Sequence, residues 1–235
     1  MKLILNNIQK NFEKNEVLKG ATFTFETGKI YGLLGRNGAG KTTLFNCINE
    51  DIKIDGGSFT VEEDGAQRKA VADDIGYVLS TPVVPEFLTG REFLKFFIDI
   101  NKDKIKESKT VDEYFEMMRI ALDDRDRLIK DYSHGMKNKM QMLVNFIASP
   151  GILLLDEPLT SFDVVVADEM KQLLRDIKSE HIIIFSTHIM ELALDLCDEI
   201  VILNNGTLDK ITKESLNNED FKDKIISALR GEDND

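Results

Sequence analysis

The spacing of hydrophobic residues divides the chain into strand-like and helix-like stretches. Near the start, Phe23 and Phe25 alternate with polar residues, which is the period-two pattern of a half-buried strand. Compact apolar runs of strand length follow at 29–34, 152–155, 182–185 and 199–203. Hairpin turns are predicted at Asn205-Gly206 and at Gly56-Gly57.

Helix signals dominate the middle of the chain. Two pairs of residues have capping-box spacing, Thr89 with Glu92 and Thr110 with Glu113. In such a box the two side chains cap the start of a helix. The pattern therefore predicts two helices that begin at these pairs.

Three further helices are expected, each with one apolar face. The first begins near Ser133 and carries Met136, Met140, Leu143, Val144 and Ile147. The second can be capped by Asp163 and carries Val166, Met170, Leu173, Leu174 and Ile177. The third lies in the tail and carries Phe221, Ile225, Ile226 and Leu229.

Strands that alternate with helices predict an α/β core, which a mainly helical segment interrupts. We expect an antiparallel β subdomain and the first part of the core over 1–82. A helical subdomain is expected over 83–148, and the second part of the core over 149–210. A C-terminal helix and an acidic tail would cover 211–235.

Composition limits the possible functions. The formal net charge is −12 at pH 7, which argues against sequence-independent nucleic-acid binding, although a local basic patch stays compatible with it. Cys47 and Cys197 both lie in apolar helical patterns, so we expect both to be reduced and buried. No apolar run approaches the ~20 residues of a membrane helix, and the first residues do not form a signal peptide. A cytosolic chain that meets a membrane only through a partner is expected.

The stretch from Gly35 to Thr42 fits G-x-x-x-x-G-K-[ST] and lies between a predicted strand and a predicted helix. Its glycines let backbone N–H groups surround a polyphosphate, and the following helix points its positive end at that anion. Lys41 would reach the terminal phosphates, and the Thr42 hydroxyl would ligate Mg²⁺. Nucleotide contacts are expected from Gly35, Arg36, Asn37, Gly38, Ala39, Gly40, Lys41, Thr42 and Thr43. The alternative is a glycine-rich turn with a chance lysine.

An acidic pair, Asp156 and Glu157, follows the apolar run 152–155. Carboxylates at the carboxyl end of a core strand lie beside the phosphate site of an α/β sheet. Asp156 is expected to hold Mg²⁺, and Glu157 to polarise the water that attacks a γ-phosphate. Taken alone, the pair would equally suit a solvated turn.

With these two motifs, the chain resembles the nucleotide-binding domains of ATP-binding-cassette proteins from about residue 3 to residue 210. Within that family it is most similar to ATPase subunits of bacterial drug, antibiotic or peptide exporters. The resemblance implies a P-loop NTPase (RecA-like) core, ATP and Mg²⁺ as cofactors, and ATP hydrolysis. It also implies a homodimer, or a dimer with a second cassette, attached to an integral membrane subunit at the inner face of the cell membrane.

The segment Tyr132-Ser133-His134-Gly135 stands where the family has its signature, usually Leu/Tyr-Ser-Gly-Gly. The resemblance implies that Ser133 and Gly135 contact ATP held by the opposite chain, although Ser133 is also a good helix cap by itself. His134 replaces a glycine. It would weaken dimer closure or make it pH-sensitive, or else it points away from the interface.

Two more site residues follow from the resemblance. The segment 161–163 stands in place of the family's D-loop, so Asp163 would contact the facing chain, in addition to capping its own helix. His188 follows the apolar run 182–185 and matches the switch histidine, which contacts the γ-phosphate and orients Glu157. A purely structural histidine is the alternative.

Three positions carry weaker signals. Phe12 stands where the family places an aromatic ring on the adenine, and Val17 often lines the same pocket. The alternative is that Phe12 is a core residue. Ser80 replaces the glutamine of the family's Q-loop, so it would reach Mg²⁺ only through water. The relay to the membrane subunit is then expected to run through 83–87.

The helical segment separates Ser133 from the phosphate loop, so two chains facing head to tail would complete two sites. ATP would close the dimer, hydrolysis would open it, and the motion would drive export. One alternative is a soluble ATPase that acts on ribosomes or DNA, which the single cassette and the acidic charge disfavour. Another is a non-catalytic regulator, which Ser80 and His134 favour and which Glu157 and His188 oppose.

Overall fold

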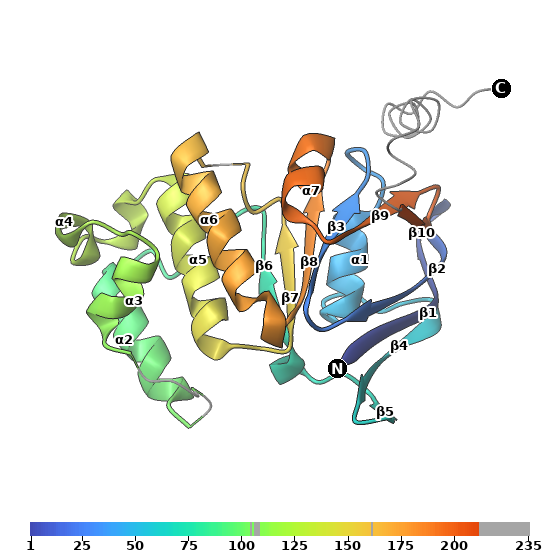
Figure 1. The fold of residues 1–235 in the computed structure, drawn as a ribbon, viewed down its shortest axis with the longest axis horizontal. Coiled ribbons are helices and arrows are strands. Elements are labelled where there is room, and N and C mark those ends of the chain that lie inside the picture. Colours follow the sequence, from blue (N-terminus) through green and yellow to red (C-terminus); the bar gives the residue numbers. More distant parts are fainter. Residues whose placement is uncertain (104, 106–108, 161, 212–235) are drawn as a thin grey trace.

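The computed structural model describes residues 1–103, 105, 109–160 and 162–211, and it shows two β-sheets with helices around them (Figure 1). The larger sheet has six strands and the smaller sheet has four. Ser161 lies outside the described residues, as does the helix predicted in the tail after residue 211. The mixed α/β architecture confirms the predicted fold class.

The larger sheet contains β3 (Lys29–Leu34), β6 (Ile75–Val78), β7 (Ile152–Asp156), β8 (Ile182–Thr187), β9 (Glu199–Asn204) and β10 (Thr207–Ile211). Their order is β10-β9-β3-β8-β7-β6. All neighbouring strands are parallel except β9 and β10, which form the predicted hairpin. Its turn residues, Asn205 and Gly206, have φ angles of 47° and 82°, as a tight hairpin turn requires.

The smaller sheet is antiparallel and contains β1 (Lys2–Phe12), β2 (Asn15–Glu26), β4 (Gly56–Glu63) and β5 (Ala66–Arg68). The prediction of a turn at Gly56-Gly57 was wrong, because these residues begin β4 and the turn lies at Asp64-Gly65. Gly57 has a φ of 81°, and a Cβ there would lie 2.1 Å from the Asn7 carbonyl oxygen. Glycine is therefore needed where β4 approaches an irregular part of β1, not for a turn.

The helices of the described residues are α1 (Lys41–Ile48), α2 (Gly90–Asn101), α3 (Val111–Met117), α4 (Leu122–Arg125), α5 (His134–Ala148), α6 (Val164–Ile177) and α7 (Met190–Leu196). Short 3₁₀ turns occur at Ala72–Asp74, Ile129–Asp131 and Lys178–Glu180. Side chains cap α2, α3, α5 and α6 as predicted, namely those of Thr89, Thr110, Ser133 and Asp163. Within the described ranges, no helix combines the length and the apolar character needed to cross a membrane.

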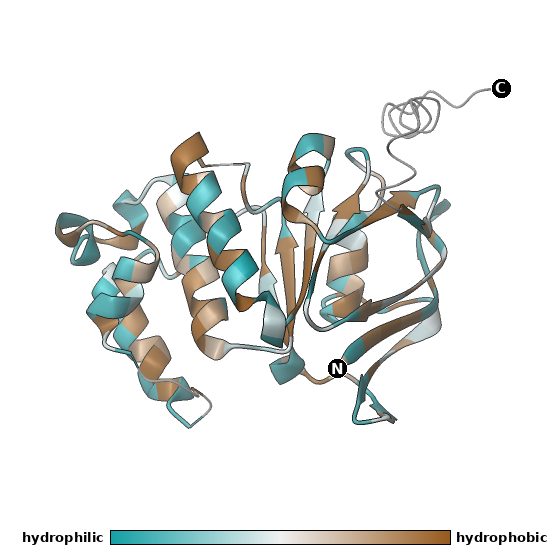
Figure 2. Cartoon of the chain, viewed as in Figure 1, coloured by the Kyte–Doolittle hydropathy of each residue, from teal (hydrophilic) through white to brown (hydrophobic). Residues whose placement is uncertain are grey.

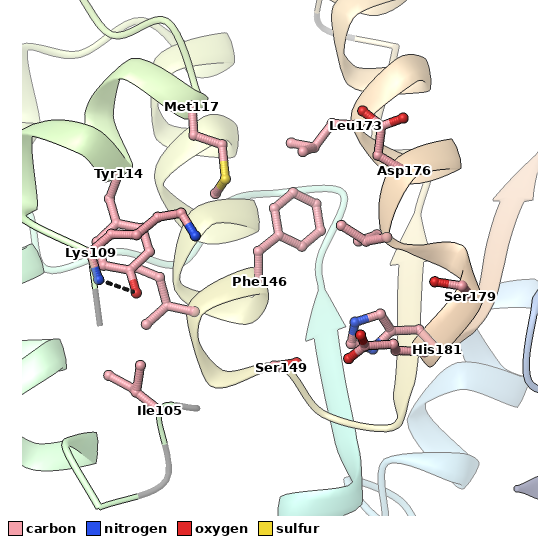
Figure 3. Close-up of a pocket in the computed structure, with 13 residues that line it drawn as sticks. Ile105, Lys109, Tyr114, Met117, Phe146, Ser149, Leu173, Asp176, Ser179 and His181 are labelled. Atoms are coloured by element: carbon pink, nitrogen blue, oxygen red, sulfur yellow. Dashed lines mark hydrogen bonds between the residues drawn. The ribbon is translucent and has the colours of Figure 1, made fainter. Parts of the chain in front are cut away.

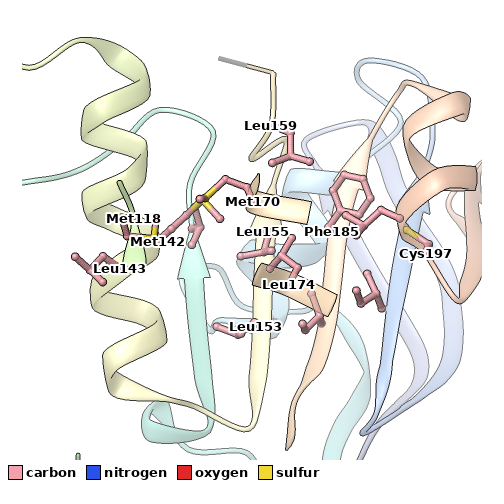
Figure 4. Packing of buried hydrophobic residues seen from close by; sticks show 14 of the residues in the cluster. Met118, Met142, Leu143, Leu153, Leu155, Leu159, Met170, Leu174, Phe185 and Cys197 are labelled. Carbon is pink, nitrogen blue, oxygen red and sulfur yellow. The ribbon is translucent and has the colours of Figure 1, made fainter. Parts of the chain in front are cut away.

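Both faces of the larger sheet are buried, and its central strands are mainly hydrophobic (Figure 2). In β7, Leu153 and Leu155 belong to a cluster that includes Leu174 of α6 (Figure 4). Ile152 and Leu154 alternate with them and belong to a second cluster on the other face. Such packing holds the strands in one register, so the carboxyl ends of β3, β7 and β8 meet at one edge of the sheet.

Neither Cys47 nor Cys197 forms a disulfide, and both are buried, as predicted. Burial raises the pKa of the Cys47 thiol to about 11. Since the thiolate is the reactive form, Cys47 behaves as a small core residue at neutral pH.

Candidate functional site

The loop after β3 leads directly into α1, at the edge where the parallel strands end. Gly38 and Gly40 have φ angles of 82° and 104°, and Gly40 immediately precedes the helix. A Cβ at Gly40 would lie 2.8 Å from Cγ1 of Val17. Because the first N–H groups of a helix have no partner within the helix, this loop presents backbone donors at the positive end of α1.

Lys41 is the first residue of α1, and its side chain folds back over the loop. Its Nζ donates to the carbonyl oxygens of Gly35 at 2.7 Å and Arg36 at 3.1 Å. The ammonium also lies 4.0 Å from Oε1 of Glu157. Burial lowers the pKa of Lys41, while Glu157 and Asp156 oppose that shift. An ammonium has three N–H donors, so one donor is left for an anion.

Asp156 ends β7 and joins two hydroxyl groups beneath the loop. Thr42 Oγ1 donates to Asp156 Oδ2 at 2.8 Å, and Ser186 Oγ donates to Oδ1. Ser186 Oγ also accepts the backbone N–H of Glu157 at 3.1 Å. The structure thus brings Thr42 and Asp156 together, as predicted, and adds Ser186 of β8, to which the sequence analysis gave no role.

Glu157 and His188 form the second predicted pair of the site. Glu157 is a non-glycine residue with a φ of 47°, a backbone conformation that costs roughly 1–2 kcal/mol and that a functional role often explains. His188 Nδ1 lies 2.9 Å from Glu157 Oε1. An ionised carboxylate only accepts hydrogen bonds, so Nδ1 of His188 carries the proton between them.

The phosphate loop, Asp156 and Glu157 open onto a pocket of about 350 Å³, whose lining does not include His188. Its lining residues are Phe12, Val17, Asn37, Gly38, Gly40, Lys41, Thr42, Thr43, Ser80, Asp156 and Glu157. Every one of them was singled out from the sequence. Gly35, Arg36 and Ala39 belong to the same loop without lining the pocket. Phe12 is 46% exposed, so the alternative that it is a core residue is wrong.

Three predicted residues lie away from this pocket. Ser133 accepts the Met136 N–H at 3.2 Å, and Asp163 accepts the N–H groups that begin α6. Gly135 lies in the first turn of α5, beside the exposed His134. Within one chain, Ser133 and Asp163 therefore act as helix caps, and their predicted contacts with ATP would require a second chain.

A second cavity, of about 380 Å³, lies between α3, α5 and α6 (Figure 3). It contains none of the residues predicted for the site. His181 faces it, but its Nδ1 donates to the carbonyl oxygen of Pro150 at 2.7 Å. This cavity is slightly larger than the pocket at Lys41, so the chemistry of the lining, rather than the volume, identifies the site.

The donor set fits Mg²⁺ bound together with a polyphosphate. In the described ranges, no group of three or more His, Cys, Asp or Glu side chains is placed to hold a metal ion. Asp156 and Thr42 instead offer one carboxylate and one hydroxyl. Mg²⁺ keeps several waters and is commonly held by one or two protein ligands plus substrate phosphates.

Residues 18–160 match the sequence profile of the ABC transporter family. The chain is 34% identical over 217 residues to human ATP-binding cassette sub-family A member 6, which covers 87% of this chain but 13% of that protein. It is 31% identical over 230 residues to the uncharacterized ABC transporter ATP-binding protein YhcH of Bacillus subtilis, which covers 94% of this chain and 73% of that protein. The chain thus spans only a small part of the human relative.

Solved structures show the same fold. An ATP-binding subunit of an ABC transporter superposes with a TM-score of 0.80 at 22% identity, over 98% of this chain and 100% of that one. A dimeric ATP-binding cassette in a post-hydrolysis state with ADP and Pi superposes with a TM-score of 0.73 at 19% identity, over 89% of this chain and 99% of that one. Since the family profile covers more than half of the chain and a relative at 31% identity matches 94% of it, this chain belongs to the ABC transporter family, as an ATP-binding domain.

Proposed function

We propose that this chain binds ATP with Mg²⁺ and hydrolyses its γ-phosphate to drive a membrane transporter. The observation that carries the proposal is the convergence of Lys41, Asp156 and Glu157 on one pocket beside the glycine loop. Lys41 begins α1, whereas Asp156 and Glu157 lie at the end of β7. Together they supply a cation, a metal ligand and a candidate base.

Binding is assigned to the loop and its neighbours. Lys41 and the loop N–H groups hold the phosphates, while Thr42 and Asp156 hold Mg²⁺. When bound, the metal neutralises charge on the phosphate oxygens. Phe12 stacks on the adenine beside Val17, a role that its exposed position at the pocket supports. Ser80 lines the same pocket and reaches the metal through water.

Hydrolysis is assigned to Glu157 and His188. Glu157 polarises the attacking water, and the hydrogen bond from His188 Nδ1 fixes the direction of its carboxylate. With Nδ1 donating to Glu157, Nε2 donates to the γ-phosphate when the imidazole ring carries both protons. The presence of this pair opposes the alternative of a non-catalytic regulator.

We further propose that two chains, or this chain and a second cassette, act as a head-to-tail dimer. The support is that Ser133, Gly135 and Asp163 lie outside the pocket of their own chain. In a dimer they would meet the ATP of the facing chain. One similar solved structure is itself a dimeric cassette.

The partner in transport is proposed to be a separate integral membrane subunit at the inner face of the cell membrane. Export as the direction of transport rests only on the resemblance of the sequence motifs to exporter ATPases. A role on ribosomes or DNA is not favoured, because the chain is acidic and the relatives compared above are transporter proteins.

The test is Lys41→Ala, with the exposed Lys95→Ala of α2 as a control. We expect the first variant to weaken ATP binding at least ~100-fold, since it removes a charge-assisted contact from a buried site. The control should bind and hydrolyse ATP as the parent does. Equilibrium dialysis would measure binding, and phosphate release would measure turnover. Unchanged affinity in Lys41→Ala would overturn the assignment of the pocket.

A further inference from the structure

Ser80 has a special position among the residues that line the nucleotide pocket. Of the lining residues in the described part of the chain, it alone comes from the stretch between Thr43 and Asp156. That stretch contains α2 to α5 and therefore Ser133. An occupant of the pocket thus touches this part of the chain through Ser80.

A buried side chain of α5 bonds the backbone of the loop that carries Ser80. Gln141 of α5 is 5% exposed. Its Oε1 accepts the N–H of Val83 at 2.8 Å, and its Nε2 donates to the carbonyl oxygen of Leu79 at 3.2 Å. One amide therefore bonds the backbone on both sides of Ser80.

Further contacts attach the continuation of this loop to the same region. Lys137, one helical turn before Gln141, bonds the Glu86 carboxylate, and Lys130 N–H donates to the Glu86 carbonyl oxygen at 3.1 Å. These bonds join the loop to α5 and to the 3₁₀ turn at Ile129–Asp131. Because α5 begins directly after Ser133, the Ser80 loop and Ser133 are connected through one helix.

We propose that Gln141 is a positioning residue that couples occupancy of the nucleotide pocket at Ser80 to the placement of α5 and Ser133. The inference rests on the proposed function, because it concerns how bound ATP prepares the surface that meets a second chain. Position 80 has a serine instead of a glutamine. In this proposal Gln141 of α5 acts on the backbone of the loop and not on the metal.

A purely structural role for Gln141 predicts something different. In that case Gln141 only satisfies two buried backbone groups. Removing its hydrogen bonds would lower the stability of the fold without separating nucleotide binding from dimerisation. A coupling role instead predicts intact binding with impaired closure. Met is close to Gln in length and removes both hydrogen bonds, so Gln141→Met distinguishes the two roles.

The experiment measures ATP-driven dimerisation in a Glu157→Gln background, by light scattering against ATP concentration with Mg²⁺ present. Gln141→Met should require at least ~10-fold more ATP for half-maximal dimerisation, as expected for a coupling free energy of typical size. Its affinity for a fluorescent ATP analogue, measured at dilutions where the chain is monomeric, should stay within ~2-fold of the parent.

Two companion variants keep the test decisive. Asn145 lies on the same face of α5 as Gln141 and donates to the Gln141 carbonyl oxygen within the helix. Asn145→Leu removes this bond, which does not involve the Ser80 loop, so the variant should dimerise like the parent. Ser80→Ala alters an exposed position and does not threaten folding. It should raise the ATP concentration needed for half-maximal dimerisation as Gln141→Met does. Adding Gln141→Met to it should raise that concentration by less than ~2-fold more, because both residues act on the same coupling.

The outcomes separate the two proposals. If the Glu157→Gln parent neither binds ATP nor dimerises, the proposed function fails and the coupling fails with it. If the parent dimerises and both Gln141→Met and Ser80→Ala dimerise at the same ATP concentration, the role of Gln141 is overturned while the ATPase proposal stands. If Gln141→Met loses nucleotide affinity and dimerisation to the same extent, Gln141 has only a structural role.

Discussion

Nδ1 of His188 lies 2.9 Å from Oε1 of Glu157, although 31 positions separate the two residues in the chain. Asp156 and Ser186 are register partners in the neighbouring parallel strands β7 and β8. The residues that follow these strands therefore emerge side by side at the same edge of the sheet. The contact is a consequence of strand register, which the buried faces of both strands fix.

Glu157→Gln should abolish turnover while ATP binding survives. The amide keeps the shape of the side chain but cannot take a proton, so we expect hydrolysis to fall at least ~100-fold. ATP affinity should stay within ~3-fold, and an ATP-bound dimer should accumulate. Phosphate release and light scattering would measure the two effects, with the exposed Glu191→Gln as a control. Turnover at the parent rate would show that Glu157 is not the base.

His188→Ala should lower the rate of hydrolysis by roughly 10- to 100-fold, because Glu157 loses the group that orients it. A double variant with Glu157→Gln should be no slower than Glu157→Gln alone, since residues that act as a unit are not additive. Single-turnover hydrolysis in the three variants would give this comparison. Fully additive losses would contradict a role for His188 through Glu157.

The glycines of the phosphate loop provide a matched pair of variants. Gly40→Ala adds a Cβ 2.8 Å from Val17 at a φ of 104°, whereas Gly38→Ala adds one at a φ of 82° with nothing within 4 Å. We expect Gly40→Ala to destabilise the fold by about 2–3 kcal/mol and Gly38→Ala by about 1 kcal/mol, the latter from conformation alone. Urea unfolding would measure both. Equal losses of unfolding free energy in the two variants would mean that the contact with Val17 does not affect stability.

Local sequence signals predicted the strands, the helix caps and the phosphate loop. Each of these depends on residues close in sequence, such as the box of Thr89 and Glu92 or the glycines before Lys41. The acidic pair after 152–155 was predicted because parallel strands share one edge for their carboxyl ends. The pocket accordingly contains residues that had all been singled out.

Contacts between distant segments were harder to predict. Gly57 was taken for a turn residue, because the sequence gives no sign that β4 must pass close to Asn7. Ser186 and Gln141 bond partners 29 or more positions away. A serine at a strand end and a glutamine within a helix are both common, and only the fold shows what each one holds. Gln141 is one of several polar residues in α5, with Asn138, Lys139 and Asn145, so its position in the sequence gave no distinct signal.

His134 occupies the position of a signature glycine at the start of α5, where it is exposed. His134→Gly should leave ATPase activity equal or higher, because it removes a bulky side chain from the proposed interface with the facing chain. The cost to the helix is small, since the first turn tolerates glycine better than the interior. Steady-state ATPase rates would check the expectation. A large loss of activity would show that His134 has acquired a role of its own.

Asp74→Asn should reduce stability at neutral pH and make it less sensitive to acid. Arg68 bonds both oxygens of Asp74, at 2.6 and 2.7 Å, and holds the pKa of this carboxyl below its usual value. A carboxyl with a lowered folded-state pKa contributes stability that is present above its unfolded pKa and is lost as pH falls through the folded pKa. Because Arg68 is 42% exposed, we expect a loss of only about 1 kcal/mol at pH 7.

The difference between Asp74→Asn and the parent should shrink below about pH 4, where the parent loses the contribution too. Urea unfolding at pH 7, 5, 4 and 3.5 would measure it. Asp209→Asn, an exposed position on β10, serves as a control with no expected change. A difference that stays constant across this range would mean that the carboxylate charge of Asp74 is not what stabilises the segment before β6.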